Sequence, residues 1–404
     1  MAKLVFESWS FNEHGDEIEA VLLNKFSLKI PLEEFSFLSE LKVQEGALLF
    51  KKMSEEQAEH KVNFLLASHL SELKNKRTGN KAVYFYPGCG IPLIGNVAWG
   101  IVYRDSSLIE LKPQTSCNLN CIYCSVGEGI HSQKTDFVID KDYLLEEFDK
   151  LLDFIGEPVE AHIGVQGEPF LYADLLPLIN ELNSRKKVQV VSLDTNGTIL
   201  TKRMIDELSL NQKLRLNMSL NAMNQEIAEK LAGTGYNLQH VLENIRYAAT
   251  KIKLLIAPLY VPGYNEEEMP RIIEFVKSLK LTNRPFIGIQ NFLQYSSGRH
   301  PAKQAAWEQF RQKTKEWAVE SGINIDLKPE DFGIRKTKPL PKPFKEGEII
   351  KARVVCEDRF SCARVAVAKG RNISINPCHS KTGAEVKVEI TRDKHNIFTG
   401  KVVK

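Results

Sequence analysis

The chain has 404 residues, of which 43% are hydrophobic and 26% are charged. These proportions are typical of globular proteins and exclude a disordered, collagen-like or low-complexity chain. No uninterrupted apolar run reaches the ~18 residues that a membrane span requires, and the N-terminus lacks the basic and apolar segments of a signal peptide. We therefore expect a cytoplasmic protein of two or three domains that has no membrane partner.

Charge is distributed unevenly along the chain. Residues 335–404 contain 17 Lys and Arg but only 7 Asp and Glu, whereas residues 1–334 contain 37 and 44, respectively. A near-neutral protein therefore ends in a basic module. Such a module attracts nucleic acid, cofactor phosphate or an acidic partner.

The first domain is predicted to span residues 1–105 as a mixed α+β region. It contains an amphipathic helical stretch near Glu55–Lys74 and a loop at Tyr86–Pro92.

Strand-like and helix-like segments alternate through the second predicted domain, residues 106–322. Strands are expected at Leu108–Lys112, Ala161–Val165, Val188–Leu193, Lys213–Leu220, Lys253–Val261 and Phe286–Phe292. Helices are expected at Tyr143–Phe154, Ala173–Asn183, Leu200–Leu208, Gln225–Leu231, Leu238–Ile252, Glu266–Leu279 and Ala302–Val319. This alternation predicts an α/β fold of six strand–helix units, with a parallel sheet covered by outer helices.

The third predicted domain, residues 323–404, begins with a Pro-rich, basic linker near Lys336–Phe344. Five short strand-like segments follow, at Glu348–Val355, Ala363–Val367, Asn372–Ile375, Ala384–Ile390 and Phe398–Val403. Short strands separated by turn residues predict a small β-barrel.

Three of the seven cysteines, Cys117, Cys121 and Cys124, fall within eight residues, on the loop after the first strand of the alternating domain. An odd number of cysteines and the lack of a secretion signal favour metal binding over disulfides. A four-iron cluster normally takes four thiolate ligands. Three local thiolates would leave one iron open for a substrate.

This cysteine spacing, with Tyr123 directly before the last cysteine, resembles the radical S-adenosylmethionine (SAM) superfamily. The resemblance implies a [4Fe-4S] cluster whose open iron binds the amino and carboxylate groups of SAM. It also implies that an electron from the cluster cleaves SAM to methionine and a 5′-deoxyadenosyl radical, which abstracts hydrogen from an unactivated carbon. The implied fold is a partial (βα)6 barrel, which agrees with the predicted strand–helix units.

A second motif lies after the second predicted strand. The segment Gly164–Pro169, which includes Gln166, Gly167, Glu168 and Pro169, is similar to the glycine–glutamate–proline motif that holds the methionine amino group in this superfamily. Glycines let a backbone approach a ligand closely. Glu168 or nearby carbonyl oxygens are able to accept hydrogen bonds from an ammonium group.

Polar residues close the third and fourth predicted strands. Asp194, Thr195 and Asn196 follow the third strand, and Ser219 and Asn221 follow the fourth. Parallel α/β folds build their sites at the C-terminal ends of strands, so these residues are candidates to hold the ribose and carboxylate of SAM. Ordinary strand-end turns are the alternative interpretation.

Two longer blocks, Cys121–Gly129 and His162–Tyr172, resemble the methanogenesis marker protein 10 family. This resemblance extends from about Tyr86 to the C-terminus. It implies an archaeal, cobalamin-dependent radical SAM methyltransferase that methylates C5 of an arginine in the methyl-coenzyme M reductase alpha subunit. The implied partners are that subunit and an electron donor, and SAM would serve both as radical source and as methyl donor to cobalamin.

The same family carries a mononuclear iron held by four cysteines, and Cys89, Cys356, Cys362 and Cys378 are the four that remain here. A four-thiolate site suits Fe or Zn. Their spacing lacks a CxxC pair, so buried free thiols are the alternative. Tyr123 is the candidate catalytic residue: its phenolate would occupy the open iron when SAM is absent, and the alternative role is packing over the cluster.

The cobalamin site is the least defined by the sequence. Asp393–Gly400 only partly matches the Asp-x-His-x-x-Gly motif of cobalamin domains, so His395 is interpreted as an ordinary surface histidine. The tail is also too short for a doubly wound domain. Cobalamin is therefore expected between the mouth of the partial barrel and residues 300–404.

The sequence is also compatible with two other functions. The basic C-terminal strands resemble a TRAM-type RNA-binding barrel, which would make the protein a tRNA-modifying radical SAM enzyme. The tail offers few aromatic residues for base stacking, which argues against RNA binding: they are Phe344, Phe360 and Phe398. A non-catalytic metal or scaffold protein is the third alternative.

Overall fold

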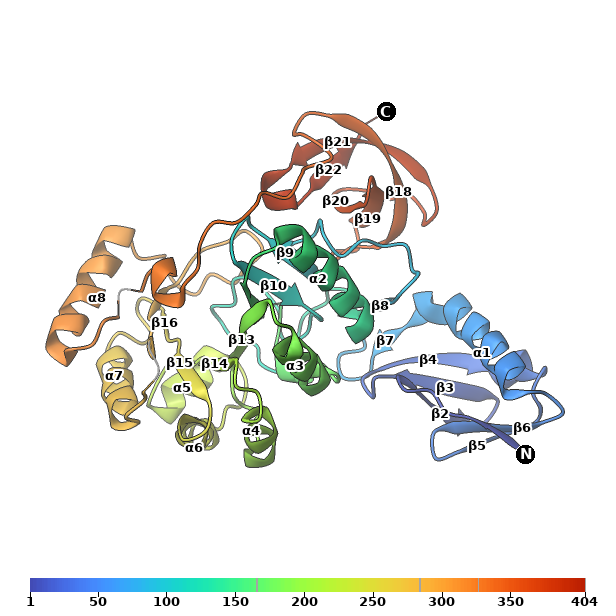
Figure 1. Ribbon diagram of the computed structural model, residues 1–404, viewed down its shortest axis with the longest axis horizontal. Coiled ribbons are helices and arrows are strands. Elements are labelled where there is room, and N and C mark those ends of the chain that lie inside the picture. Colours follow the sequence, from blue (N-terminus) through green and yellow to red (C-terminus); the bar gives the residue numbers. More distant parts are fainter. Residues whose placement is uncertain (165, 283–284, 326, 404) are drawn as a thin grey trace.

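The computed structural model in Figure 1 describes residues 1–164, 166–282, 285–325 and 327–403. Val165, at the end of the second predicted strand, lies outside the described residues. So do residues 283, 284, 326 and 404 of the predicted domains.

The N-terminal region consists of two small antiparallel sheets and one helix. One sheet has the order β1-β6-β5 and the other the order β2-β3-β4-β7. The strands are β1 (Ala2–Leu4), β2 (Trp9–His14), β3 (Glu17–Leu22), β4 (Phe26–Pro31), β5 (Ser39–Gln44), β6 (Ala47–Lys51) and β7 (Lys74–Asn75). Helix α1 (Glu55–His69) begins after Ser54, whose side chain accepts a hydrogen bond from the Gln57 amide. It ends five residues before the end of the predicted helical stretch.

The central region is built on a six-stranded sheet with the order β15-β14-β13-β12-β10-β9. Its strands are β9 (Gly100–Tyr103), β10 (Leu108–Lys112), β12 (Val159–Ile163), β13 (Val188–Thr195), β14 (Leu214–Met218) and β15 (Lys253–Ile256). Strands β10 to β15 run parallel, and β9 adds an antiparallel edge. After β15, a short parallel pair extends this arrangement: β16 (Leu259–Tyr260) and β17 (Gln290–Asn291). This arrangement confirms the predicted α/β fold with a curved parallel sheet.

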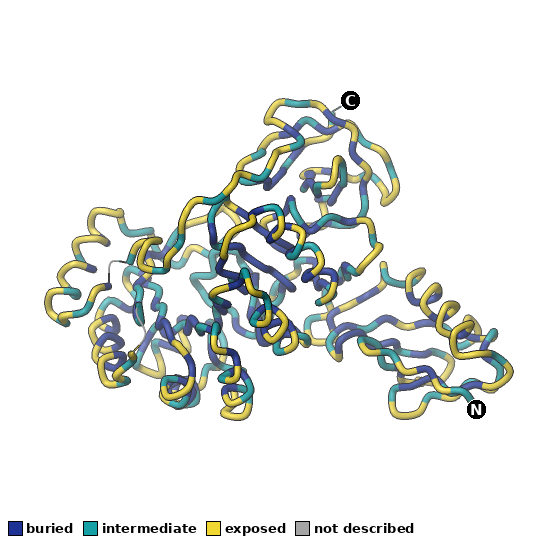
Figure 2. Tube along the Cα trace, viewed as in Figure 1, coloured by how far each residue is buried: buried dark blue, intermediate teal, exposed yellow. Residues whose placement is uncertain are grey.

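Helices cover the outer face of this sheet, as Figure 1 shows. They are α2 (Lys141–Ile155), α3 (Leu175–Ser184), α4 (Lys202–Leu208), α5 (Gln225–Ala232), α6 (Leu238–Ala249), α7 (Glu268–Ser278) and α8 (Trp307–Ser321). The burial trace in Figure 2 alternates along them, because each helix buries one apolar stripe against the strands. Leu144, Phe148 and Leu151 form that stripe on α2.

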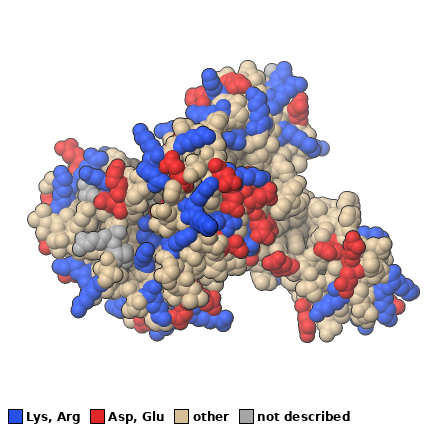
Figure 3. All heavy atoms as spheres, in the orientation of Figure 1, with Lys and Arg blue, Asp and Glu red and all other residues tan. Residues whose placement is uncertain are grey.

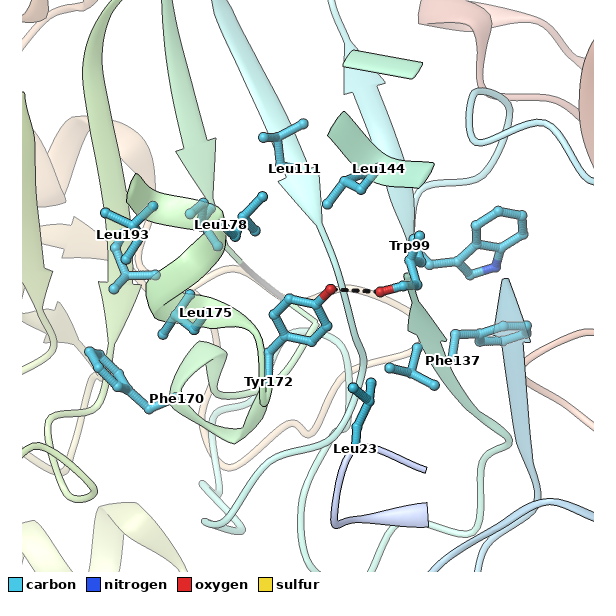
Figure 4. Packing of buried hydrophobic residues seen from close by; sticks show 14 of the residues in the cluster. Leu23, Trp99, Leu111, Phe137, Leu144, Phe170, Tyr172, Leu175, Leu178 and Leu193 are labelled. Carbon is cyan, nitrogen blue, oxygen red and sulfur yellow. Dashed lines mark hydrogen bonds between the residues drawn. The ribbon is translucent and has the colours of Figure 1, made fainter. Parts of the chain in front are cut away.

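Two strands in this region, β9 and β11, were not predicted. β11 (Asp136–Ile139), which follows the cysteine loop in the chain, pairs in parallel with β8 (Ala82–Phe85). Its Phe137 stacks on Phe85 and Trp99, with ring centroids 5.5 and 5.4 Å apart. Figure 4 shows Trp99 and Phe137 on one side of Tyr172, whose hydroxyl donates to the Ile139 carbonyl at 2.7 Å. Val138 of β11 also forms an isolated antiparallel bridge with Gln114. A four-residue strand held mainly by a partner about fifty residues earlier leaves no periodic signal in the sequence.

The C-terminal region forms a closed barrel with the order β18-β19-β20-β22-β21, which confirms the predicted β-rich module. Its strands are β18 (Ile349–Glu357), β19 (Arg364–Ala368), β20 (Arg371–Ile375), β21 (Glu385–Arg392) and β22 (Thr399–Val402). A separate buried cluster that includes Phe344, Val354, Ile373, Val388 and Phe398 fills it. In Figure 1 the barrel and the N-terminal sheets lie on different sides of the central sheet.

No helix among the described residues is both long enough and apolar enough to cross a membrane.

Candidate active site

A cavity of about 400 Å³ opens at the C-terminal ends of the parallel strands. The cysteine loop forms one wall and the ends of β13, β14, β16 and β17 form the others. Its lining includes the predicted residues Cys117, Cys121, Tyr123, Cys124, Gly167, Glu168, Asp194, Thr195, Asn196, Ser219 and Asn221. Gln166 and Pro169 are buried behind the wall rather than exposed in it.

The cysteine loop is held in place by backbone contacts on two sides. The Asn120 and Ile122 amides donate to the carbonyls of Ala232 and Leu231 at the end of α5, at 2.9 and 3.0 Å. On the other side, Ser116 and Gly167 form a parallel bridge. Gly167 has φ +142°, and a Cβ added there would lie 1.9 Å from the Ser116 carbonyl oxygen. Only glycine permits this approach.

The three thiols surround the cavity and do not converge on a single point. No three His, Cys, Asp or Glu side chains among the described residues are arranged to hold one metal ion. Burial raises the pKa of the Cys117 thiol and raises that of Cys121 to about 11. Buried thiols become thiolates when a cationic metal centre takes the place of their protons. Three thiols around a shared space fit three corners of an iron–sulfur cluster.

Glu168 joins two strand ends with one buried carboxyl group. Its Oε1 accepts hydrogen bonds from the Thr195 hydroxyl at 2.7 Å and the Phe170 amide at 3.2 Å, and its Oε2 accepts from the Asn196 amide at 2.8 Å. Burial raises the pKa of Glu168 to about 7. The carboxyl group is thus engaged within the protein, while the Glu168 backbone faces the cysteine loop.

Tyr123 lies over Cys121 and accepts a hydrogen bond from the Asn221 side-chain amide. Burial, together with the adjacent Cys121, raises the pKa of the Tyr123 phenol well above its usual range. Asn221 is fixed in turn, because its Oδ1 accepts from the Leu259 amide at 2.8 Å. The phenol therefore has a fixed position beside the cluster ligands.

The floor of the cavity rests on a closed ring of polar side chains from β12, β13 and β14. Asp194 contacts His162 at 3.3 Å and Asn217 at 2.8 Å, and His162 contacts Ser192 at 2.8 Å. Glu160 and Arg215 complete the ring, with Arg215 2.6 Å from Glu160 and 3.1 Å from Asn217.

This ring keeps Asp194 charged. Burial alone would raise the pKa of Asp194, but His162, Asn217 and Arg215 together outweigh burial and lower it. Burial alone would lower the pKa of His162, and Asp194 reverses that effect. The cavity therefore has a negative group at its floor, with a cationic partner below it.

Sequence reasoning missed several residues that line the cavity: Glu128, Asn217, Gln290, Asn291 and Tyr295. Asn217 belongs to the fourth strand, and the last three lie at or just after the sixth. The rule that placed Asp194 and Asn221 at strand ends would have selected them as well. Glu128 follows the last cysteine and carried no separate signal.

The other four cysteines do not form one compact group. Cys356, near the end of β18, lies within electrostatic range of Cys89, and burial raises the pKa of both thiols. Cys362 is exposed and Cys378 is buried, and the Cys378 amide donates to the Cys362 carbonyl at 2.8 Å. All three barrel cysteines lie at the same end of the barrel, but the described side chains do not surround one ion.

The parallel α/β fold and the three cysteines that line one cavity fit an iron–sulfur enzyme, and comparison with known proteins identifies the family. Residues 111–276 match the family model of the radical SAM superfamily. The chain is 38% identical over 371 residues to the uncharacterized protein MJ0103 of Methanocaldococcus jannaschii, covering 85% of each chain. The chain therefore belongs to the radical SAM superfamily of enzymes, which implies a [4Fe-4S] cluster and SAM.

More distant relatives share only part of the chain. A GTP 3′,8-cyclase from Lactiplantibacillus plantarum is 29% identical over 46% of this chain and 60% of its own length. Among solved structures, a spore photoproduct lyase mutant with bound AdoMet matches with TM-score 0.44 and 12% identity, over 61% of this chain and 81% of its own. SuiB of Streptococcus suis matches with TM-score 0.43 and 14% identity, over 80% and 71%.

Proposed function

We propose that the protein is a cobalamin-dependent radical SAM methyltransferase that methylates C5 of an arginine in the methyl-coenzyme M reductase alpha subunit. The observation that carries this proposal is that two blocks resembling one methyltransferase family, Cys121–Gly129 and His162–Tyr172, both contribute residues to the same cavity, the second through Gly167 and Glu168. The 38% identical relative comes from a methanogen, which supports a role in methanogenesis.

The residues of the cavity divide into three roles in this proposal. Cys117, Cys121 and Cys124 would hold three irons of the cluster. The backbone around Gly167 would receive the methionine amino group, while Glu168 keeps that backbone and the end of β13 together. When bound, the cluster and SAM supply the radical chemistry that an unactivated carbon requires.

Four other residues that line the cavity would orient SAM: Tyr123, Asn196, Ser219 and Asn221. They also line a small adjoining pocket with Tyr236. Positioning of this kind brings the reacting carbon within reach of the radical and excludes water.

Cobalamin and a mononuclear iron complete the proposed cofactor set. A cavity of about 400 Å³ suits one ligand of the size of SAM. The much larger cobalamin would have to lie over the mouth of the cavity, toward residues 300–404. The barrel cysteines would need to move toward Cys89 to hold an iron, because they do not surround one ion in this structure.

Anaerobic turnover followed by mass spectrometry tests the proposal. The reconstituted protein is mixed with SAM, a strong reductant, cobalamin and an arginine-bearing peptide of the methyl-coenzyme M reductase alpha subunit. A matched peptide with Lys in place of the target Arg is the control. The proposal expects methylated arginine peptide together with 5′-deoxyadenosine and S-adenosylhomocysteine. Deoxyadenosine without peptide methylation would overturn the assigned substrate but leave a radical enzyme, and absence of SAM cleavage would overturn both.

RNA modification is the second candidate, because the strand order of the barrel, with β20 parallel to β22, is that of OB-type barrels. Such barrels bind oligonucleotides on strands 2 and 3 and on two adjacent loops. Here that face packs on the core: Asn372 donates to the Pro92 and Ile94 carbonyls at 2.7 and 3.1 Å, and the Phe398 amide donates to Gly95 at 2.8 Å.

On the face of the barrel that Figure 3 shows, positive charge is not concentrated in one patch. Figure 3 shows basic side chains on its exposed side interspersed with acidic ones. Salt-sensitive tRNA binding, which log–log titration against salt would reveal, is the result that would favour this alternative.

A further inference from the structure

An arginine of the C-terminal barrel reaches the back of the cysteine loop. Arg359 lies in the turn between β18 and β19 and is 6% exposed. Its Nη2 donates to the Glu128 carboxylate, and its Nη1 donates to the Thr135 carbonyl and, at 2.8 Å, to the Thr115 hydroxyl. The Thr135 amide in turn donates to the Arg359 carbonyl at 3.1 Å. The turn is therefore docked by both its side chain and its backbone.

A second carboxylate extends this contact into a buried network. Asp136 Oδ1 lies 3.7 Å from Arg359, and Asp136 Oδ2 accepts from the Asn75 amide at 2.8 Å. Lys134 lies 3.8 Å from Glu128 and places its ammonium group over the Phe360 ring. The N-terminal region, the cysteine loop and the barrel thus meet in one group of balanced charges.

Glu128 connects this network to a cluster ligand. Its amide donates to the Cys124 sulfur at 3.3 Å, and Glu128 lines the same cavity as Cys124. The Glu128 carbonyl accepts from Arg299 at 2.9 Å, and Arg299 also donates to the Cys121 carbonyl at 2.8 Å. Two arginines therefore hold the loop from different sides, one from the core and one from the barrel.

Such contacts influence an iron–sulfur cluster in two ways. Hydrogen bonds to the ligand sulfurs and the net charge nearby set its reduction potential. In addition, a buried carboxylate that loses its cationic partner is strongly disfavoured. Without Arg359, the Glu128 carboxylate would keep only the more distant Lys134, at 3.8 Å, among the cations described around it, and the segment whose amide donates to Cys124 would be held less firmly.

We propose that Arg359 is a positioning residue for the iron–sulfur cluster, through which the C-terminal barrel fixes the Cys124 end of the cysteine loop and sets the charge beside the cluster. This role depends on membership of the radical SAM superfamily and is independent of the substrate that is methylated.

The first test uses the full-length protein without its cluster. Alkylation of each cysteine by iodoacetamide is followed by peptide mass spectrometry in wild type, Arg359→Gln and the matched control Arg353→Gln, which changes an exposed arginine on β18. We expect Arg359→Gln to raise the Cys124 alkylation rate by about tenfold, with a smaller change at Cys117. Equal acceleration at both cysteines would indicate general destabilisation and would overturn the assignment.

The second test measures the cluster itself. The reduction potential of the reconstituted protein is determined by redox titration with EPR detection. Arg359→Gln removes a positive charge and should make the potential more negative, whereas the double change Arg359→Gln with Glu128→Gln keeps the net charge and should restore most of the shift. An unchanged reduction potential in Arg359→Gln would contradict the proposal.

Arg359→Lys covers the case in which Arg359→Gln does not fold. It retains the charge but cannot donate to Glu128 and Thr115 together. Its potential should stay close to that of wild type while Cys124 alkylation accelerates. Wild-type alkylation at Cys124 in this variant contradicts the positioning role.

Discussion

Glu168 holds three donors from two segments with one buried carboxyl group. The Thr195 hydroxyl and the amides of Phe170 and Asn196 all point at it. A residue in this position stabilises the wall of the cavity as well as any ligand that the wall receives. The protonation state of Glu168 therefore affects the stability of the folded protein.

We expect the Glu168→Gln variant to change how stability depends on pH. Burial raises the pKa of Glu168 to about 7. Between its ordinary pKa and this value, the folded state holds a proton that the unfolded state has released, so the wild-type free energy of unfolding decreases as pH rises through 7. The amide of Gln does not titrate, but it places an NH2 group opposite one donor, which costs about 1–3 kcal/mol at acidic pH.

Urea unfolding of the cluster-free protein at pH 5, 6, 7 and 8 measures this difference. The variant should be the less stable protein at pH 5. The difference in free energy of unfolding between the two proteins should become smaller toward pH 8. A gap that stays constant across this range would show that Glu168 does not titrate there.

At the scale of elements, the site depends on the contact between two loops that belong to different strand–helix units. The Ser116 amide donates to the Gln166 carbonyl at 3.1 Å, and the Glu168 amide donates to the Ser116 carbonyl at 2.9 Å. This short parallel bridge aligns the segment after β12 with the cysteine loop. The relative position of the cluster ligands and the proposed methionine site follows from it.

Gly167→Ala should separate these two loops. The added Cβ would lie 1.9 Å from the Ser116 carbonyl oxygen, at a φ of +142° that L-residues rarely adopt. A strain of about 1–3 kcal/mol is expected, with at least a tenfold loss of SAM affinity at unchanged iron content. Titration calorimetry with SAM measures the affinity. Gly235→Ala, where a Cβ meets nothing within 4 Å, is the control, and equal SAM affinity in the two variants would contradict the role given to this contact.

At the scale of the whole molecule, the C-terminal barrel docks on the core through a face that is largely buried. Asn372 is completely buried and bonds to Pro92 and Ile94. A Cβ at Gly95 would lie 2.1 Å from the Asn372 carbonyl, so backbone meets backbone at this interface. Close packing of this kind fixes the barrel relative to the cavity.

Asn372→Ala should loosen the barrel without unfolding it. Loss of the side-chain bond to Pro92 leaves a buried carbonyl without its donor, which costs about 1–3 kcal/mol. We expect faster tryptic cleavage in the basic linker near Lys336–Lys345. Thr382→Ala, in an exposed turn of the barrel, should leave the cleavage rate unchanged. Cleavage of Asn372→Ala at the wild-type rate would mean that this bond does not hold the interface.

Much of the architecture was readable from local patterns. The sequence of Tyr143–Phe154 predicted α2, and the spacing of Cys117, Cys121 and Cys124 predicted the cluster loop. Such patterns lie within one element, where side-chain periodicity reflects which face is buried. The family of the protein follows from the same short segments.

Only the tertiary structure decided which segments meet. Two examples are the pairing of β11 with β8 and the place of Glu128 between Cys124 and Arg359, which bring together chain regions far apart in sequence. Long-range pairing is set by the packing of whole elements rather than by local periodicity. The sequence by itself therefore determined the repeating strand–helix units and the cysteine motif, and packing between the three regions determined the walls of the cavity.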